Sequence, residues 1–151
     1  MNRLTADERQ RLASLAARVD CDRVRLHRGA GMVRRLVLWA SRGRAVTLGN
    51  HVFLPDRVAR DLPVLAHELI HCGQFQRWGA WRYLTRGAAA QARELLFRRL
   101  GIGRSPYAYR LEEGKAFEAY GIEQQGQIVE DSVRGDPGAL AVSPYRPTDL
   151  A

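Results

Sequence analysis

The sequence predicts an α+β fold, a mostly helical single domain with a small sheet or hairpin packed on a central helix. Apolar residues recur at helical spacing in several segments, most clearly in residues 62–78. Three short segments before residue 55 instead alternate as strands do. With 151 residues, of which 46% are hydrophobic, the chain can form one core, and no apolar run approaches the roughly 20 residues that span a bilayer.

The first expected element is a helix over residues 4–19. Thr5 followed by Glu8 is a capping box, in which each residue bonds a backbone N–H of the other at a helix start. Residues 24–27 alternate apolar and polar side chains, which predicts a short strand. Residues 32–40 suit either a short amphipathic helix or a strand. We favour the helix, with Arg34 and Arg35 exposed.

Residues 45–48 and 51–54 read as two strands joined by a tight turn. The turn residues, Gly49 and Asn50, both tolerate the positive φ that such turns need. The second strand leads directly to the helix over residues 62–78. The sequence therefore predicts a hairpin next to that helix.

Gly79 is a plausible end for the central helix. The bulky apolar residues around it predict a core cluster: Trp78, Trp81, Tyr83 and Leu84. Further helices are expected over residues 88–100 and 109–128, the latter with a break at Gly114 or Gly121. Residues 132–151 contain three prolines and two glycines and lack periodicity, so we place the domain at residues 1–131 and expect a loosely ordered tail.

The central helix contains His67-Glu68-Leu69-Ile70-His71, a complete H-E-x-x-H. Residues four apart lie on the same helix face, so both imidazoles can hold one zinc ion, with Glu68 placed to reach a water molecule. Asp61 can cap the helix, and Pro63 is tolerated in its first turn. The plainer interpretation is a helix with two histidines and no metal. The apolar surroundings argue against it, because burying an unpaired Glu68 would be costly.

The net charge of +8 is unevenly distributed. Residues 1–110 hold 21 arginines against 8 acids, a balance of +13, whereas residues 111–151 hold 3 cations against 8 acids, a balance of −5. A basic surface can bind nucleic acid, but no aromatic and basic interleaving accompanies it, so we favour a solvated surface. No membrane partner is expected, and the sequence indicates no oligomeric state.

The N-terminal residues lack the apolar region of a secretory signal, which predicts a cytoplasmic protein or one exported without a signal peptide. Cys21 and Cys72 form no C-x-x-C and are expected to be reduced, buried thiols. Cys72 follows His71 directly, but its side chain points away from the ligand face, so it is not counted as a ligand.

A catalytic zinc commonly takes three protein ligands and a water molecule. A third histidine at position 77 is excluded because Arg77 stands there, and no histidine follows His71. The third ligand is therefore expected to be a carboxylate from a second helix. The candidates are Glu112, Glu113, Glu118, Glu123 and Glu130.

The motifs GNHVFLPDR, LPVLAHELIHCGQFQRWG and EQQGQIVED, within residues 45–131, resemble small gluzincin-type zinc metallopeptidases. These include minigluzincins and the peptidase-like core domain found with contractile injection systems. The resemblance implies a zincin-like fold and a third ligand that opens an E-x-x-A type motif. Glu123, with Gly126 at the small position, fits better than Glu113, which remains the second candidate. Gln127 stands where many gluzincins have an aspartate that orients a ligand histidine.

The resemblance implies peptide-bond hydrolysis at a Zn²⁺ held by His67, His71 and Glu123. Glu68 would act as the general base. A tyrosine could stabilise the developing oxyanion, the candidates being Tyr107, Tyr109 and Tyr120. The strand over residues 51–54 could pair with an extended peptide or protein substrate, although an internal strand without a ligand role is equally compatible with the sequence.

Two other functions fit the same residues. A zinc-binding, peptidase-like domain without general proteolysis could serve as an interaction or toxin-associated part of a secretion system. The intact Glu68 argues against a purely structural zinc site, which needs no base. A DNA-associated protease would suit the basic N-terminal region, but SprT-like proteins use a third histidine that this chain lacks.

Overall fold

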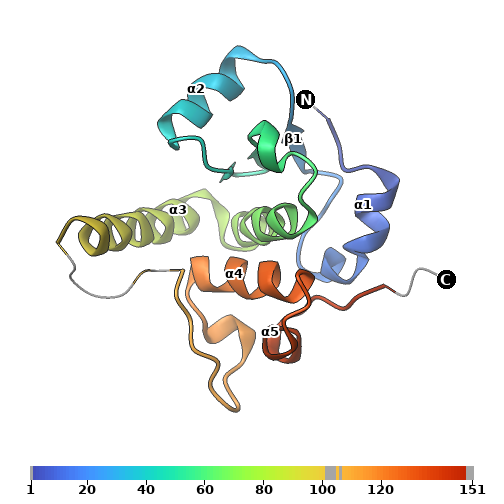
Figure 1. The fold of residues 1–151 in the computed structure, drawn as a ribbon, viewed down its shortest axis with the longest axis vertical. Coiled ribbons are helices and arrows are strands. Elements are labelled where there is room, and N and C mark those ends of the chain that lie inside the picture. The colour runs from blue at the N-terminus through green and yellow to red at the C-terminus, as the bar shows by residue number, and fades with distance from the viewer. Residues whose placement is uncertain (1, 101–104, 106, 149–151) are drawn as a thin grey trace.

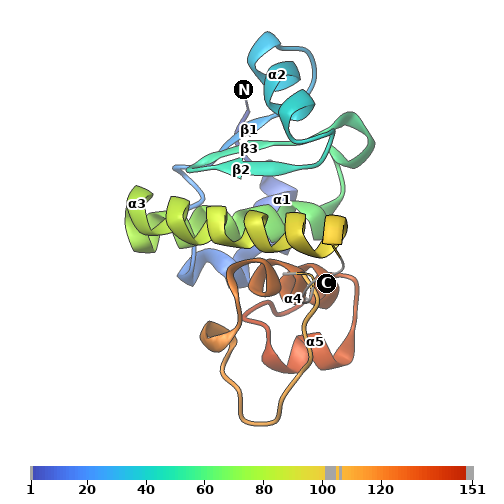
Figure 2. The same ribbon diagram turned by 90° about the vertical axis from the view of Figure 1, so that its left-hand side faces the viewer.

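Helix α3 (Leu62–Leu100) lies between a three-stranded sheet on one side and helices α4 (Ile122–Val133) and α5 (Pro137–Val142) on the other (Figure 1). The computed structural model describes residues 2–100, 105 and 107–148. Helix α2 (Met32–Ala40) lies beyond the sheet at one end of the molecule (Figure 2), and α1 (Ala6–Arg11) lies at the side of the molecule (Figure 1). The predicted α+β class, mostly helical with a small sheet on the central helix, is confirmed.

The sheet has the strand order β1-β3-β2, with β1 at Arg25–His27, β2 at Val46–Leu48 and β3 at His51–Phe53. β2 and β3 form the predicted antiparallel hairpin, while β1 runs parallel to β3. β3 is therefore internal, which excludes residues 51–54 as a free edge for a substrate and confirms the alternative of an internal strand. β1 and β2 are the edge strands of the sheet. The parallel partner of β3 comes from a distant part of the chain, so the hairpin alone did not indicate that β3 is internal.

The N-terminal segment begins with the predicted capping box. Thr5 N donates to the Glu8 carboxylate at 2.9 Å, and Glu8 N donates to the Thr5 hydroxyl at 3.2 Å. The single helix expected over residues 4–19 is instead α1 followed by a 3₁₀ helix at Ala13–Ala17. The change of helix type turns Leu12 and Leu15 into the core, where both are almost fully buried.

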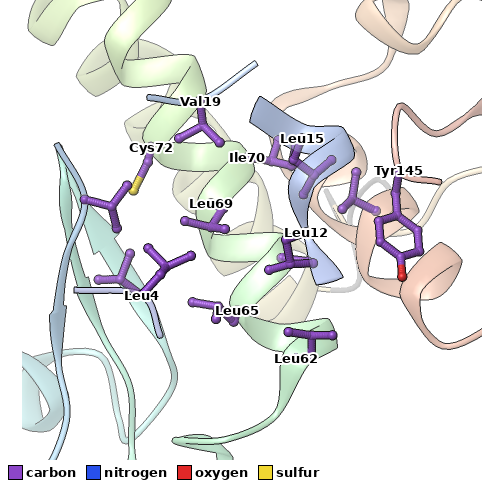
Figure 3. Packing of buried hydrophobic residues seen from close by; sticks show 14 of the residues in the cluster. Leu4, Leu12, Leu15, Val19, Leu62, Leu65, Leu69, Ile70, Cys72 and Tyr145 are labelled. Carbon is purple, nitrogen blue, oxygen red and sulfur yellow. The ribbon is translucent and has the colours of Figure 1, made fainter. Parts of the chain in front are cut away.

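The core forms around the first half of α3. Figure 3 shows Leu65, Leu69 and Cys72 on the side of α3 that faces the sheet, and Leu12 and Leu15 approaching from the N-terminal segment. Both cysteines are free; Cys72 is buried, which raises the pKa of its thiol, while Cys21 is only half-buried. Burial of these side chains fixes the register of α3 and thereby the face that remains for its polar residues.

Gly79 interrupts α3 with φ 76° and ψ 168°, a conformation that favours glycine, and the helix resumes at once. The predicted end at Gly79 therefore separates two helical parts, and the second part begins earlier than residue 88. The expected core cluster around this point is wrong for Trp81 and Leu84, which are 80% and 59% exposed. Among the described residues, no helix is both long enough and apolar enough to cross a membrane.

The helix predicted over residues 109–128 starts much later, because Gly121 is the N-cap of α4. A 3₁₀ helix at Phe117–Ala119 precedes it. The segment after residue 131 is also more ordered than expected. Asp136 caps α5, which starts with Pro137, and Tyr145 is buried in the core. An Asp-Pro pair is a helix-start signal that outweighs the proline and glycine content of this segment.

Candidate metal centre

The two histidines of the H-E-x-x-H lie on one face of α3 and meet the first turn of α4. His67 Nε2 lies 3.2 Å from His71 Nε2. Glu123 Oε2 lies 3.8 Å from His67 Nε2 and 3.4 Å from His71 Nε2. All three side chains are buried, and their potential ligand atoms form a group that could hold a metal ion.

The spacing of these atoms fits a tetrahedral metal. Zinc bonds to imidazole and carboxylate of about 2.0–2.2 Å place neighbouring tetrahedral ligands roughly 3.3–3.6 Å apart. The three separations, 3.2, 3.4 and 3.8 Å, lie close to that range. The residues present therefore suit a divalent metal with three protein ligands.

Glu130 orients His67 from two helical turns beyond Glu123 on α4. His67 Nδ1 lies 3.0 Å from Glu130 Oε2, and a carboxylate can only accept, so Nδ1 carries a proton and Nε2 is the ring nitrogen that faces the metal group. Arg134 donates to the other Glu130 oxygen at 2.9 Å. The resemblance placed this orienting role at position 127, but Gln127 donates to Asp131 instead.

A chain of side-chain amides orients His71. His71 Nδ1 lies 2.8 Å from Gln74 Oε1, and Gln74 Nε2 donates to Gln125 Oε1 at 3.0 Å. Gln125 Nε2 donates in turn to the Tyr120 carbonyl at 2.8 Å. Because this chain ends on a backbone acceptor, each amide has one orientation, and His71 is held with Nδ1 protonated and Nε2 facing the group.

The electrostatic field at the two Nε2 atoms favours a cation. Burial lowers the pKa of His67, but the carboxylates of Glu123 and Glu130 raise it overall to about 10. Burial raises the pKa of Glu123, yet the two imidazoles hold it well below its usual range. A site that holds a proton this strongly also attracts a divalent metal, which brings more charge to the same carboxylates.

Glu68 is buried beside this group but is not part of it. Its Oε2 accepts a hydrogen bond of 2.6 Å from the Thr47 hydroxyl of strand β2. Thr47 is itself held by the sheet, and its carbonyl accepts a hydrogen bond from Tyr83 at 3.1 Å. The sheet therefore fixes the Glu68 carboxylate next to the metal group without making it a ligand.

The N-terminal half of the chain matches a known protein family. The family model described as "eCIS core domain" matches residues 3–79, just over half of the chain. This chain belongs to the eCIS core domain family. The matched region includes the whole H-E-x-x-H of this eCIS core domain and ends before Glu123.

The chain is also similar to a curated protein, the type VI secretion system spike protein VgrG2b of Pseudomonas aeruginosa PAO1. The two are 48% identical over 65 residues, which make up 43% of this chain and 6% of that protein. The chain thus corresponds to a small part of the length of the spike protein. No solved structure matches the chain.

The other carboxylates considered as ligands in this chain lie outside the metal group. Glu112 pairs with Lys115 at 2.7 Å, and Glu118 pairs with Arg18 at 2.5 Å. Glu113 is exposed and is not in the metal group. Of the candidate carboxylates, the structure brings Glu123 to the histidine pair and gives Glu130 an orienting role that the sequence analysis missed.

Gly126 allows the close approach of α4 to His67. A Cβ atom at this position would lie 2.7 Å from His67 Nε2, the ligand atom itself. We expect Gly126→Ala to displace the imidazole and to weaken metal affinity by roughly 10–100-fold, the range found when the orientation of a ligand is disturbed. A competition titration with a chromophoric zinc chelator measures this affinity.

Gly87→Ala is the matched control for that experiment. It is the same substitution within a helix, and a Cβ atom there would have no neighbour within 4 Å. Its metal affinity should equal that of the parent. Equal affinities for the parent and Gly126→Ala would show that α4 can move away from His67 at little cost.

Proposed function

We propose that this domain binds a divalent metal through His67, His71 and Glu123 and acts as a component of a contractile injection or secretion system. The observation that carries the first part is the convergence of three buried ligand atoms within 3.8 Å, each imidazole oriented by a separate hydrogen bond. Membership of the eCIS core domain family and similarity to a secretion-system spike protein support the second part.

We propose zinc as the metal. Two imidazoles and one carboxylate form the ligand set of many catalytic zinc sites. The same ligand set also occurs in non-haem iron enzymes, so the metal must be identified directly. Inductively coupled plasma mass spectrometry of the purified protein should find about one zinc ion per chain. Stoichiometric iron would contradict the assignment.

Chelation should also destabilise the domain. The metal would link α3 to α4 and would therefore bind only the folded state. Such binding stabilises the folded state, and the gain increases with the ratio of the free metal concentration to Kd. We expect a lower Tm after treatment with a chelator and recovery on addition of zinc. A Tm that is unchanged by chelation in protein shown to contain zinc would place the metal outside this site.

Peptide-bond hydrolysis is the second candidate function, and the position of Glu68 favours it. A structural metal site needs no base, yet a buried carboxylate lies next to the ligand group and accepts a hydrogen bond from Thr47. A bound zinc would supply Lewis-acid activation of a water molecule and of a substrate carbonyl. Glu68 would accept the proton of that water and pass it to the leaving amine.

Tyr107 is the best placed of the three tyrosines to contact a substrate carbonyl. Its ring centroid lies 6.5 Å from that of His67. For hydrolysis we propose Tyr107 as the donor to the developing oxyanion, because its ring lies beside that of the proposed metal ligand His67.

A further inference from the structure

Helix α2 exposes its apolar face and buries a charged one. Met32, Val33, Leu36 and Trp39 are 78%, 62%, 61% and 82% exposed, whereas Arg34 is only 8% exposed. The prediction that Arg34 is exposed is therefore wrong. Apolar side chains at positions i, i+1, i+4 and i+7 form one stripe, so α2 presents a continuous apolar surface.

The hydrogen bonds of Arg34 set this orientation. Its Nε donates to the Leu54 carbonyl at 2.9 Å, Nη1 to the Gly29 carbonyl at 2.8 Å, and Nη2 to the Asp56 carboxylate at 2.7 Å. Rolling the helix inward to bury Trp39 would break all of them and leave a buried charge unpaired. The outward apolar face is therefore a fixed feature of the fold.

The surroundings of this face are strongly basic. Residues 23–55 contain seven arginines and no aspartate or glutamate. Arg35, Arg42 and Arg44 are exposed on α2 or just after it. Asp56, the first acid after α2 along the chain, forms an ion pair with Arg34.

The face also lies at an outer end of the molecule. In both ribbon views α2 is the outermost element beyond the sheet, at the opposite end from α5 (Figures 1 and 2). A protruding helix can lie on a flat partner without contact from the rest of the domain. Most of the acidic C-terminal region lies on the far side of α3 and would not oppose an anionic partner.

We propose that α2 docks on the surface of an anionic lipid bilayer. Trp39, Leu36 and Met32 would enter the interface between headgroups and acyl chains, which tryptophan favours. The neighbouring arginines would contact lipid phosphates, each adding a contribution that salt screens. Apolar stripe, basic rim and protrusion together fit such a surface.

Co-sedimentation with vesicles tests this proposal on the full chain. We expect binding to an equal mixture of phosphatidylglycerol and phosphatidylcholine, little binding to phosphatidylcholine alone, and weaker binding as salt is raised. Trp39→Ser should lower the partition coefficient roughly tenfold, because a buried tryptophan contributes a large apolar area. Trp81→Ser is the matched control, since Trp81 is equally exposed but lies on α3.

Several results would overturn the proposal. These are no binding to the anionic vesicles, equal binding to neutral vesicles, or an equal loss of binding in both tryptophan variants. Unchanged far-UV circular dichroism of the Trp39→Ser variant shows that a loss is not caused by unfolding. Binding of the domain to an acidic protein through α2, with no affinity for vesicles, would assign the face to a protein partner instead.

Discussion

Glu68→Gln is expected to lower the proposed peptide hydrolysis by at least about 100-fold without loss of the proposed metal. The substitution preserves the size of the side chain, and the amide oxygen can still accept the hydrogen bond that Thr47 gives to the carboxylate at 2.6 Å. It removes the ability to accept a proton. Cleavage of a peptide library, measured with metal content on the same samples, tests this expectation.

Glu112→Gln provides the control for the loss of a carboxylate. Glu112 is exposed and pairs with Lys115, away from the metal group, so its loss should leave both activity and metal unchanged. Equal cleavage by the parent and Glu68→Gln would show that Glu68 is not the base. A parent that binds zinc and cleaves no peptide would favour a peptidase-like component without general proteolysis.

The central features of the fold could be predicted from the sequence because they depend on residues that are close together in it. The H-E-x-x-H spacing put His67 and His71 on one helix face, and the structure keeps them there, 3.2 Å apart. The Thr5 and Glu8 capping box and the hairpin around Gly49 are also set by residues close in sequence. Short-range geometry leaves few alternatives in such segments.

The errors concern contacts between distant segments. Strand β1 pairs with β3, whose residues lie 26 positions later in the sequence, and this pairing makes β3 internal. The alternation of apolar and polar residues in either strand does not predict the pairing. Arg34 is buried because the carbonyls of Gly29 and Leu54 meet around α2. A pattern of apolar and charged residues identifies the two faces of a helix, but tertiary contacts decide which face is buried.

The metal group shows the same division. The sequence selected Glu123 from five carboxylates through a family resemblance, whereas the orienting residues come from different elements. Glu130 reaches His67 across 63 residues of sequence, and Gln74, which orients His71, is itself held by Gln125 of another helix. The spacing of Glu123 and Glu130, seven residues or two helical turns, is the signal that both face α3, and it could have been found in the sequence.

Glu123→Gln is expected to weaken zinc affinity by more than about 100-fold, beyond the roughly 10–100-fold range found for residues that only orient a ligand. It removes the one carboxylate of the metal group and with it much of the negative charge that attracts the metal, while the side-chain volume is kept. The imidazoles then face each other at 3.2 Å with a neutral amide in place of the charge. A competition titration, repeated on the parent, measures the difference.

Two further variants give this experiment its scale. Glu130→Gln, which changes only the residue that orients His67, should produce the smaller loss, because Nε2 of His67 remains a ligand. Glu113→Gln should produce none, since Glu113 is exposed and outside the metal group. The order of the three affinities separates ligation, orientation and surface charge. A large loss for Glu113→Gln with none for Glu123→Gln would move the third ligand to the segment before α4 and require that segment to fold over the histidine pair.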